Sequence, residues 1–246
     1  ILLVPFMSCG ARLPIYGLMT AAFFPRAGGL IVFALYVLAL VIAIASGVFL
    51  KHSIFKGEPA PFLLELPPYR LPTLHNLWLH VWERVRDFLT RAGTIILAMS
   101  IVLWFLQSFD THLQMVPSTA DSILAAAGGA IAPLFAPLGF GVWQAAVALL
   151  TGLIAKEAVV SSMSLFYGFA INDGAAAGAA MATTFTPAAA LAFLVFCALY
   201  TPCIAAIATI RREMGSRKWT AFCLAWQLAV AYAAALVTHL VAGLLL

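Results

Sequence analysis

Charged side chains are scarce in this sequence: Asp, Glu, Lys and Arg together make up 9% of its 246 residues. A water-soluble domain needs a polar surface of mixed charges, so this composition excludes that class of protein. Apolar residues account for 64%, and the mean hydropathy is +1.06. The sequence therefore predicts an all-α, polytopic transmembrane helical bundle, because a helix satisfies its own backbone hydrogen bonds in lipid.

Signatures of catalysis and of nucleic-acid binding are absent from the sequence. The histidines show no HExxH or other ligand spacing, and there is no Gly-rich phosphate loop, nucleophile elbow or Ser/His/Asp ordering. We therefore expect no enzymatic activity in this chain. The 13 basic and 9 acidic residues give a net charge of +4, but the excess lies in two blocks. That pattern indicates orientation in a membrane and no nucleic-acid partner.

Cysteine is also rare, and all of its positions lie in apolar surroundings: Cys9, Cys197, Cys203 and Cys223. This distribution predicts reduced, buried thiols without a disulfide framework. A membrane thiol oxidoreductase using Cys197 and Cys203 is one alternative function. However, their spacing puts them about 240° apart on a helix, and no C-x-x-C pair occurs.

Apolar runs long enough to cross a bilayer recur along the chain. A span needs about 20 apolar residues to cross roughly 30 Å of hydrocarbon. The candidate spans are 29–50, 92–109, 141–167, 187–210 and 219–246. Two less regular stretches, 1–24 and 120–137, are interrupted by Pro and Gly, and we expect each to be a re-entrant or half-helix.

The region 51–91 differs in composition, with many basic residues and the proline-rich run GEPAPFLLELPPYRLP. From Leu74 to Leu89 apolar residues recur at helical spacing with polar residues opposite, and Thr73 is placed to cap the helix. The tryptophans Trp78 and Trp82 and a basic face predict an amphipathic helix at the cytoplasmic membrane interface. A helix packed on neighbouring loops is the alternative.

Lys and Arg place 51–91 and the run RREMGSRK at 211–218 on the cytoplasmic side. The loop 108–139 has neither residue and is expected outside. The segment NDGAAAGAAMATTFTP at 172–187 has the composition of a flexible loop, to which we assign no function.

The predicted topology contains a parity conflict. The segment 168–186 should be outside, because the next span enters the cytoplasm at Arg211. One crossing by 141–167 would leave that segment inside. Either 120–137 also crosses, or 141–167 is broken and returns. Both options put irregular backbone at membrane depth, which lipid tolerates only around a protein-lined cavity.

Three clusters carry residues suited to an ion pathway: PFMSCGARLP at 5–14, GLIAKEAVV at 152–160 and YTPCIAAIA at 200–208. Pro202 has no amide hydrogen, so a backbone carbonyl near Ala198 loses its helical partner and must find another donor or a cation. Thiolates and freed carbonyls are ligands for borderline first-row metals, and they can replace the hydration shell of a transported ion.

The candidate ligands in these clusters are thiol, thioether and hydroxyl side chains next to a Pro or Gly: Met7, Ser8, Cys9, Thr201 and Cys203. Packing as a small apolar side chain is the alternative for each of the two thiols, and it is our interpretation of Cys197 and Cys223.

Glu157 lies inside an apolar segment, where a carboxylate costs several kcal/mol unless it faces a cavity or a partner. We therefore expect a functional charge there. Lys156 points about 100° away around the helix, so the two need not pair. Lys156 and Arg12 are each open to two interpretations, a functional cation or a side chain that snorkels to the interface.

Several motifs resemble the ferrous iron transport protein B family. VPFMSCGARLPIYGLMTAAFF and LYTPCIAAIATIRREMGSRKW are similar to its two Gate segments, and GLIAKEAVVSS is similar to the motif between them. The proline-rich loop and LWLHVWERVRDFLTRAGTIIL also match, so the resemblance covers nearly all 246 residues. It implies a multi-pass transporter of the bacterial inner (cytoplasmic) membrane that imports Fe²⁺, with a first Gate-like segment at 1–25 and the second Gate-like segment and last span at 187–246.

The resemblance also implies parts that we expect to lie outside this chain. In that family a cytoplasmic GTP-binding domain and a helical regulatory domain precede the membrane region, so this chain would be the later part of the permease. GTP and Mg²⁺ are implied for the missing domain, and no cofactor is implied for this chain. Its implied partners are the lipid bilayer, its own N-terminal GTP-binding domain and small cytoplasmic accessory proteins, and a homo-oligomer stays open.

By this resemblance, Cys9 and Cys203 match the Gate cysteines along the iron path, and Lys156 and Glu157 match the charged motif. Many members have arginine where this chain has Lys156, which favours a cationic role over a guanidinium-specific one. Our hypothesis is a transient Fe²⁺ site near the midplane, formed by both cysteines with Met7, their hydroxyl neighbours and freed carbonyls, with Glu157 as an additional charge. The alternative is a carrier of nucleosides or other organic solutes, and ligand type does not discriminate Fe²⁺ from Mn²⁺ or Zn²⁺.

Overall fold

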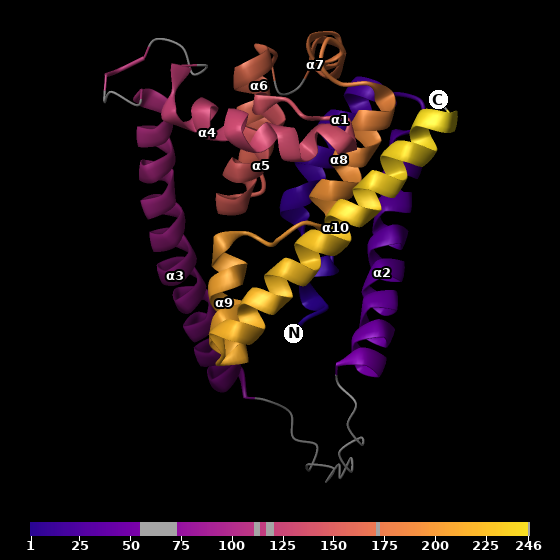
Figure 1. Ribbon diagram of the computed structural model, residues 1–246. Helices are drawn as coiled ribbons and strands as arrows, with labels where there is room; N and C mark the ends of the chain where they lie inside the picture. The colour runs from indigo at the N-terminus through magenta and orange to yellow at the C-terminus, as the bar shows by residue number, and fades with distance from the viewer. Residues whose placement is uncertain (55–72, 111–113, 117–120, 171–172, 246) are drawn as a thin grey trace.

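A computed structural model describes residues 1–54, 73–110, 114–116, 121–170 and 173–245 (Figure 1). Within these ranges the regular structure is helical, apart from an isolated antiparallel bridge between Phe109 and Met115. The predicted all-α bundle is therefore confirmed. The proline-rich run of the predicted cytoplasmic loop lies outside the described residues.

Three apolar stretches of the described chain are long enough to cross a membrane: α2 (Gly28–Ser53), α8 (Pro187–Leu199) together with α9 (Ile204–Met214), and α10 (Arg217–Leu245). Helix α8 lies at the centre of the bundle, since all of its residues except Pro187 and Leu191 are buried. Helix α10 crosses α8 obliquely in Figure 1. These elements confirm the predicted spans at 29–50, 187–210 and 219–246.

Helix α3 (Leu74–Ser108) joins two elements that the sequence separated. The predicted amphipathic helix and the span at 92–109 form one continuous helix, since no Pro interrupts them. Thr73 caps it as expected, accepting a hydrogen bond from the backbone N–H of Asn76 at 3.4 Å. At 1.5 Å per residue its 35 residues extend about 52 Å, which exceeds the roughly 30 Å hydrocarbon core.

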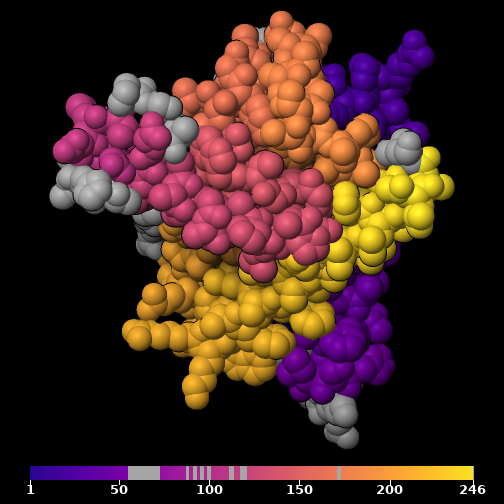
Figure 2. All heavy atoms as spheres, turned by 45° about the horizontal axis from the view of Figure 1, so that its top comes forward, coloured from indigo at the N-terminus to yellow at the C-terminus, as the bar shows by residue number. Residues whose placement is uncertain are grey.

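Short helices replace a single span between residues 123 and 167. They are α4 (Ile123–Ile131), η4 (Ala132–Leu138), α5 (Trp143–Ile154) and α6 (Ala158–Tyr167). The α4–η4 pair meets α5 at 104°. The hydroxyl of Tyr232 in α10 donates to the carbonyl of Leu134 at 3.0 Å, so η4 lies against α10, and the two surfaces adjoin in Figure 2.

Helices α5 and α6 form an antiparallel hairpin. The hydroxyl oxygens of Thr151 and Ser162 lie 3.0 Å apart near the tip, and the rings of Trp143 and Phe166 are 5.2 Å apart near the open end. The segment 141–167 is therefore broken and returns, which is the second of the two options that the sequence left open. This return removes the parity conflict.

Helix α7 (Gly174–Met181) corrects the prediction of a flexible loop. The carboxylate of Asp173 accepts a hydrogen bond from the N–H of Ala176 at 2.9 Å and caps the helix. Alanine has the highest helix propensity, so a capped alanine-rich segment forms a helix once a neighbour covers it. The neighbour is α1 (Leu13–Phe23), whose Ala22 carbonyl would collide with any side chain at Gly178.

The first segment of the chain is a half-helix, as predicted. Two short turns, η1 (Val4–Phe6) and η2 (Gly10–Arg12), precede α1, whose 11 residues extend about 16 Å. The basic ends of α2, α3 and the α9–α10 turn lie together at the bottom of Figure 1, opposite α4 and α7. This arrangement agrees with the assignment of the basic segments to one side of the membrane.

Candidate functional site

Three interruptions of helical structure meet inside the bundle. They are the turns before α1 at 4–12, the tip of the α5–α6 hairpin at 155–157, and the break between α8 and α9 at 200–203. Each contains one of the clusters that the sequence predicts for an ion pathway. Buried cationic side chains join the first two interruptions to the third and to the end of α8.

Arg12 connects the first interruption to the end of α8. Its side chain is 2% exposed, and its Nη1 donates to the carbonyl oxygen of Ala198 at 2.6 Å. Its Nη2 donates to the carbonyl of Pro5 at 3.2 Å. Because Pro202 cannot donate to the Ala198 carbonyl, the guanidinium supplies the missing donor. This contact confirms that the freed carbonyl takes a cation, and it excludes the snorkelling interpretation of Arg12.

Lys156 connects the hairpin tip to the same break. It is 3% exposed, and its Nζ donates to the carbonyl oxygen of Thr201 at 2.8 Å. The same Nζ lies 3.2 Å from the centroid of the Tyr200 ring, a cation–π contact. A buried ammonium needs such partners to offset its lost hydration. Lys156 is therefore an internal cation and does not snorkel.

The fit between hairpin and break depends on Gly152. A Cβ at this position would collide with the Tyr200 hydroxyl and with Val159, so the last turn of α5 can approach the break at Tyr200 only because it lacks a side chain there. The Tyr200 hydroxyl is buried and has no hydrogen-bond partner within the described residues. Buried hydroxyls are normally paired, so this one, packed against Gly152, is an exception.

The two thiol candidates lie at the same helix interruptions as these cations. Cys9 is in the first interruption together with Arg12, and Cys203 is in the third, where Lys156 binds the Thr201 carbonyl. Cys203 is half-buried at the start of α9, and Cys9 is exposed. The two predicted thiol ligands, 194 positions apart in the sequence, therefore lie at interruptions that Arg12 and Lys156 join to the end of α8 and the break after it.

The other predicted ligands take different positions. Met7 is 59% exposed, and the Ser8 hydroxyl lies 3.3 Å from the Tyr16 hydroxyl. Thr201 is half-buried and offers its carbonyl to Lys156. Among the described residues no group of three or more His, Cys, Asp or Glu side chains is close enough to hold a metal ion. A cation here would therefore draw on thioether, hydroxyl and carbonyl groups in addition to the thiols.

Glu157 differs from its expected position inside a continuous helix. It is the last residue of the hairpin tip, directly before the first residue of α6, and it is exposed. A carboxylate at a helix N-terminus is favoured by the unpaired N–H groups there. Lys156 and Glu157 therefore occupy different environments, one buried against Tyr200 and one open.

Sequence reasoning left Arg12 and Lys156 open as functional cations without placing them among the ligands, and it did not single out Tyr200. The available signal was a basic residue next to a chain break inside an apolar segment. By contrast, Cys197 and Cys223 are fully buried, as expected for packing residues, and the amide of Gln227 donates to the Cys223 sulfur at 3.2 Å.

Comparison with known proteins gives two family matches. The family model described as "Ferrous iron transport protein B C terminus" matches residues 32–84, and the Gate model, described as "Nucleoside recognition", matches residues 89–217. No solved structure matches the chain.

Curated relatives include three proteins named Fe(2+) transporter FeoB. The one from Staphylococcus aureus (strain COL) is 41% identical over 232 residues, covering 94% of this chain and 34% of the relative. The one from Methanocaldococcus jannaschii is 38% identical over 252 residues, covering 100% of this chain and 37% of the relative. The one from Salmonella paratyphi A is 36% identical over 286 residues, covering 96% and 37%. The chain thus spans about a third of the length of these relatives.

Proposed function

We propose that this chain, which belongs to the ferrous iron transport protein B family, forms the membrane pathway through which Fe²⁺ enters the cytoplasm. Relatives that align with nearly all of it are named as Fe(2+) transporters. The structural observation that supports the proposal is the meeting of three helix interruptions at the buried cations Arg12 and Lys156, with Cys9 in one interruption and Cys203 in another. Irregular backbone at this depth is expected only where it lines a path or a site.

In this proposal Fe²⁺ exchanges part of its hydration shell for the thiolates of Cys9 and Cys203, for Met7 and for the hydroxyl and carbonyl groups beside them. Sulfur and carbonyl ligands suit a borderline divalent ion. Conduction also requires that the ion leave again, so binding must stay weak.

Lys156 is suited to limit the residence of the ion. Its ammonium already donates a hydrogen bond to the Thr201 carbonyl, so an entering Fe²⁺ competes with the ammonium for that oxygen and is repelled by its charge. Arg12 holds the Ala198 carbonyl in the same manner. We propose that these two resident cations keep the carbonyls oriented when no ion is bound and favour release when one is.

The proposal is tested by measuring Fe²⁺ uptake in cells that carry Cys9→Ser, Cys203→Ser or both. Each single change should lower uptake, and the double change should lower it further, while membrane insertion stays normal. Cys223→Ser is the matched control, because its sulfur contacts Gln227 in α10 and should leave uptake unchanged. Wild-type uptake in both single variants and in the double variant would refute the ligand assignment.

A nucleoside carrier is the second candidate function, because the Gate model carries the description "Nucleoside recognition". Competition separates the two. If Fe²⁺ is the substrate, an excess of nucleosides leaves radiolabelled Fe²⁺ uptake unchanged; inhibition by nucleosides together with direct nucleoside flux would favour the carrier.

Location, orientation and nucleotide chemistry complete the proposal. We propose that the chain lies in the cytoplasmic membrane with the α9–α10 turn inside, and that GTP and Mg²⁺ act in a domain outside this chain. Purified chain 1–246 should then bind no GTP, and labelling of a cysteine introduced at Ser216 should require a membrane-permeant reagent.

A further inference from the structure

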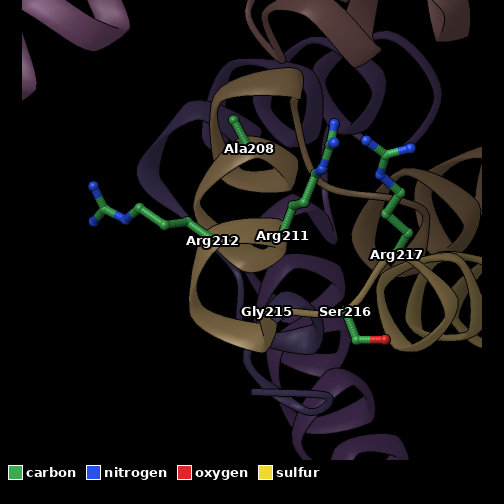
Figure 3. Close-up of a pocket in the computed structure, with 6 residues that line it drawn as sticks. All are labelled: Ala208, Arg211, Arg212, Gly215, Ser216 and Arg217. Carbon is green, nitrogen blue, oxygen red and sulfur yellow. The ribbon is translucent and has the colours of Figure 1, made fainter.

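The turn between α9 and α10 presents two arginines to one side. Figure 3 shows Arg211 at the end of α9 and Arg217 at the start of α10 extending toward the same region, whereas Arg212 extends to the opposite side. Arg212 forms an ion pair with Glu213, with Nη2 and Oε1 at 3.4 Å. Within the described ranges no ion pair involves Arg211 or Arg217.

The backbone of the turn enforces this arrangement. Helix α9 ends at Gly215, whose φ of 62° is the left-handed conformation that glycine adopts without strain. Helix α10 then begins at Arg217. Two positively charged side chains are thus held beside each other, although their mutual repulsion would favour separation.

The two guanidinium groups line adjoining hollows of about 560 Å³ and 540 Å³. The first hollow is completed by residues of the turn, including Gly215 and Ser216. The N-terminus of α10 adds partial positive charge at the same place. Two neighbouring guanidinium groups that form no ion pair among the described residues are suited to bidentate binding of a phosphate group.

The second hollow adds an apolar surface to the charged turn. Beyond Arg211 and Arg217 it is lined by Thr220, Ala221 and Leu224. Positions three, four and seven residues after Arg217 lie on one face of α10, so the hollow extends from the charged turn along an increasingly apolar strip. The adjacent Trp219 is 41% exposed, and exposed tryptophan is typical of the membrane–water interface.

We propose that the α9–α10 turn binds an anionic phospholipid of the cytoplasmic leaflet. Its phosphate lies between Arg211 and Arg217, and an acyl chain follows the strip from Thr220 to Leu224. The charge, the interfacial position and the apolar extension together favour a lipid over a free anion. The site lies at the opposite end of α9 from Cys203 and does not depend on the identity of the transported substrate.

The test is lipid binding to the purified chain in detergent, followed by native mass spectrometry. The probes are phosphatidylglycerol and phosphatidylcholine with identical acyl chains, with inorganic phosphate as a competitor. The variant Arg211→Gln/Arg217→Gln removes both guanidiniums. The control Lys51→Gln/Lys218→Gln removes the same charge from the same end of the molecule, and neither lysine lines the hollows.

Wild-type protein and the lysine control should both prefer phosphatidylglycerol, and the arginine variant should lose at least about tenfold in its affinity. If that variant fails to fold, Arg211→Lys/Arg217→Lys is used in its place. It keeps the charge but loses the bidentate geometry of the guanidinium groups, so it should bind phosphatidylglycerol several-fold more weakly than the wild type.

Three results would overturn the proposal. Unchanged lipid binding in the arginine variants would place the lipid elsewhere. An equal loss in the lysine control would show attraction by diffuse charge without a site. If inorganic phosphate displaces the lipid and binds to the wild type but not to the arginine variants, the occupant of the site is a free anion.

Discussion

The ammonium of Lys156 lies 2.8 Å from the carbonyl oxygen of Thr201, a residue 45 positions away in the sequence. This hydrogen bond joins the tip of a re-entrant hairpin to the break in the central helix. The Tyr200 ring covers the same ammonium at 3.2 Å, so both partners of the lysine come from the break. The contact couples the position of the hairpin to the geometry of the break.

Replacement of Lys156 by Met should destabilise the protein. The partly buried Thr201 carbonyl would lose its donor, which costs at most roughly 1–3 kcal/mol. Thermal unfolding of the purified chain measures the effect, and Lys51→Met, at an exposed position, is the control. Lys156→Arg keeps the positive charge and should retain more of both stability and Fe²⁺ uptake. Equal stability of the Met variant and the wild type would contradict the role assigned to this bond.

Replacement of Arg12 by Leu should have a larger effect. The guanidinium serves the carbonyls of Ala198 and Pro5, and both would lose a charged donor inside the bundle. We expect a loss of about 3 kcal/mol or more and a lower amount of protein in the membrane. Arg26→Leu removes an exposed arginine and serves as the control. Normal amounts and normal unfolding of the Arg12 variant would show that another group satisfies these carbonyls.

Gly152→Ala should separate the hairpin from the break, because the added Cβ would collide with the Tyr200 hydroxyl and with Val159. We expect reduced thermal stability and reduced Fe²⁺ uptake. Gly129→Ala is the matched control, since nothing lies near a Cβ at that position in α4. Combining Gly152→Ala with Tyr200→Phe removes one of the collisions, so the double variant should recover part of the loss. A double variant no better than Gly152→Ala would argue against this contact.

Tyr200→Phe by itself separates stability from transport. The hydroxyl has no hydrogen-bond partner among the described residues, so its removal should leave the unfolding temperature unchanged or slightly higher. The ring that covers Lys156 is retained. If the hydroxyl faces the ion path, Fe²⁺ uptake falls although the protein is as stable as the wild type. Unchanged uptake would remove the hydroxyl from the path.

Chemical modification should distinguish the cysteines. Cys9 is exposed, whereas Cys197 and Cys223 are buried. A small maleimide should therefore label Cys9 first and leave the buried pair unmodified in the folded protein, as peptide mass spectrometry can determine. Anaerobic Fe²⁺ should slow the labelling of Cys9 and of the half-buried Cys203. Labelling rates that do not respond to Fe²⁺ would contradict their assignment as ligands.

Local sequence determined much of this protein. Apolar length predicted α2 and α10, and Thr73 predicted the start of α3. Pro202 also predicted an unpaired carbonyl near Ala198, because the absence of an amide hydrogen is a property of proline wherever the helix packs. The alanine-rich segment of α7 was assigned wrongly, since its turn-forming composition hid a capped helix that packs on α1.

Tertiary structure alone decided which groups complete those local features. The donor for the Ala198 carbonyl is Arg12, 186 positions away, and no local pattern could select it. The return of α5–α6 likewise depends on packing, because an apolar segment with a break satisfies the hydrophobic requirement whether it crosses or turns back. Composition therefore determined which segments enter the membrane and where they break. Contacts between distant residues decided that the breaks meet, because buried charges are stable only where their partners converge.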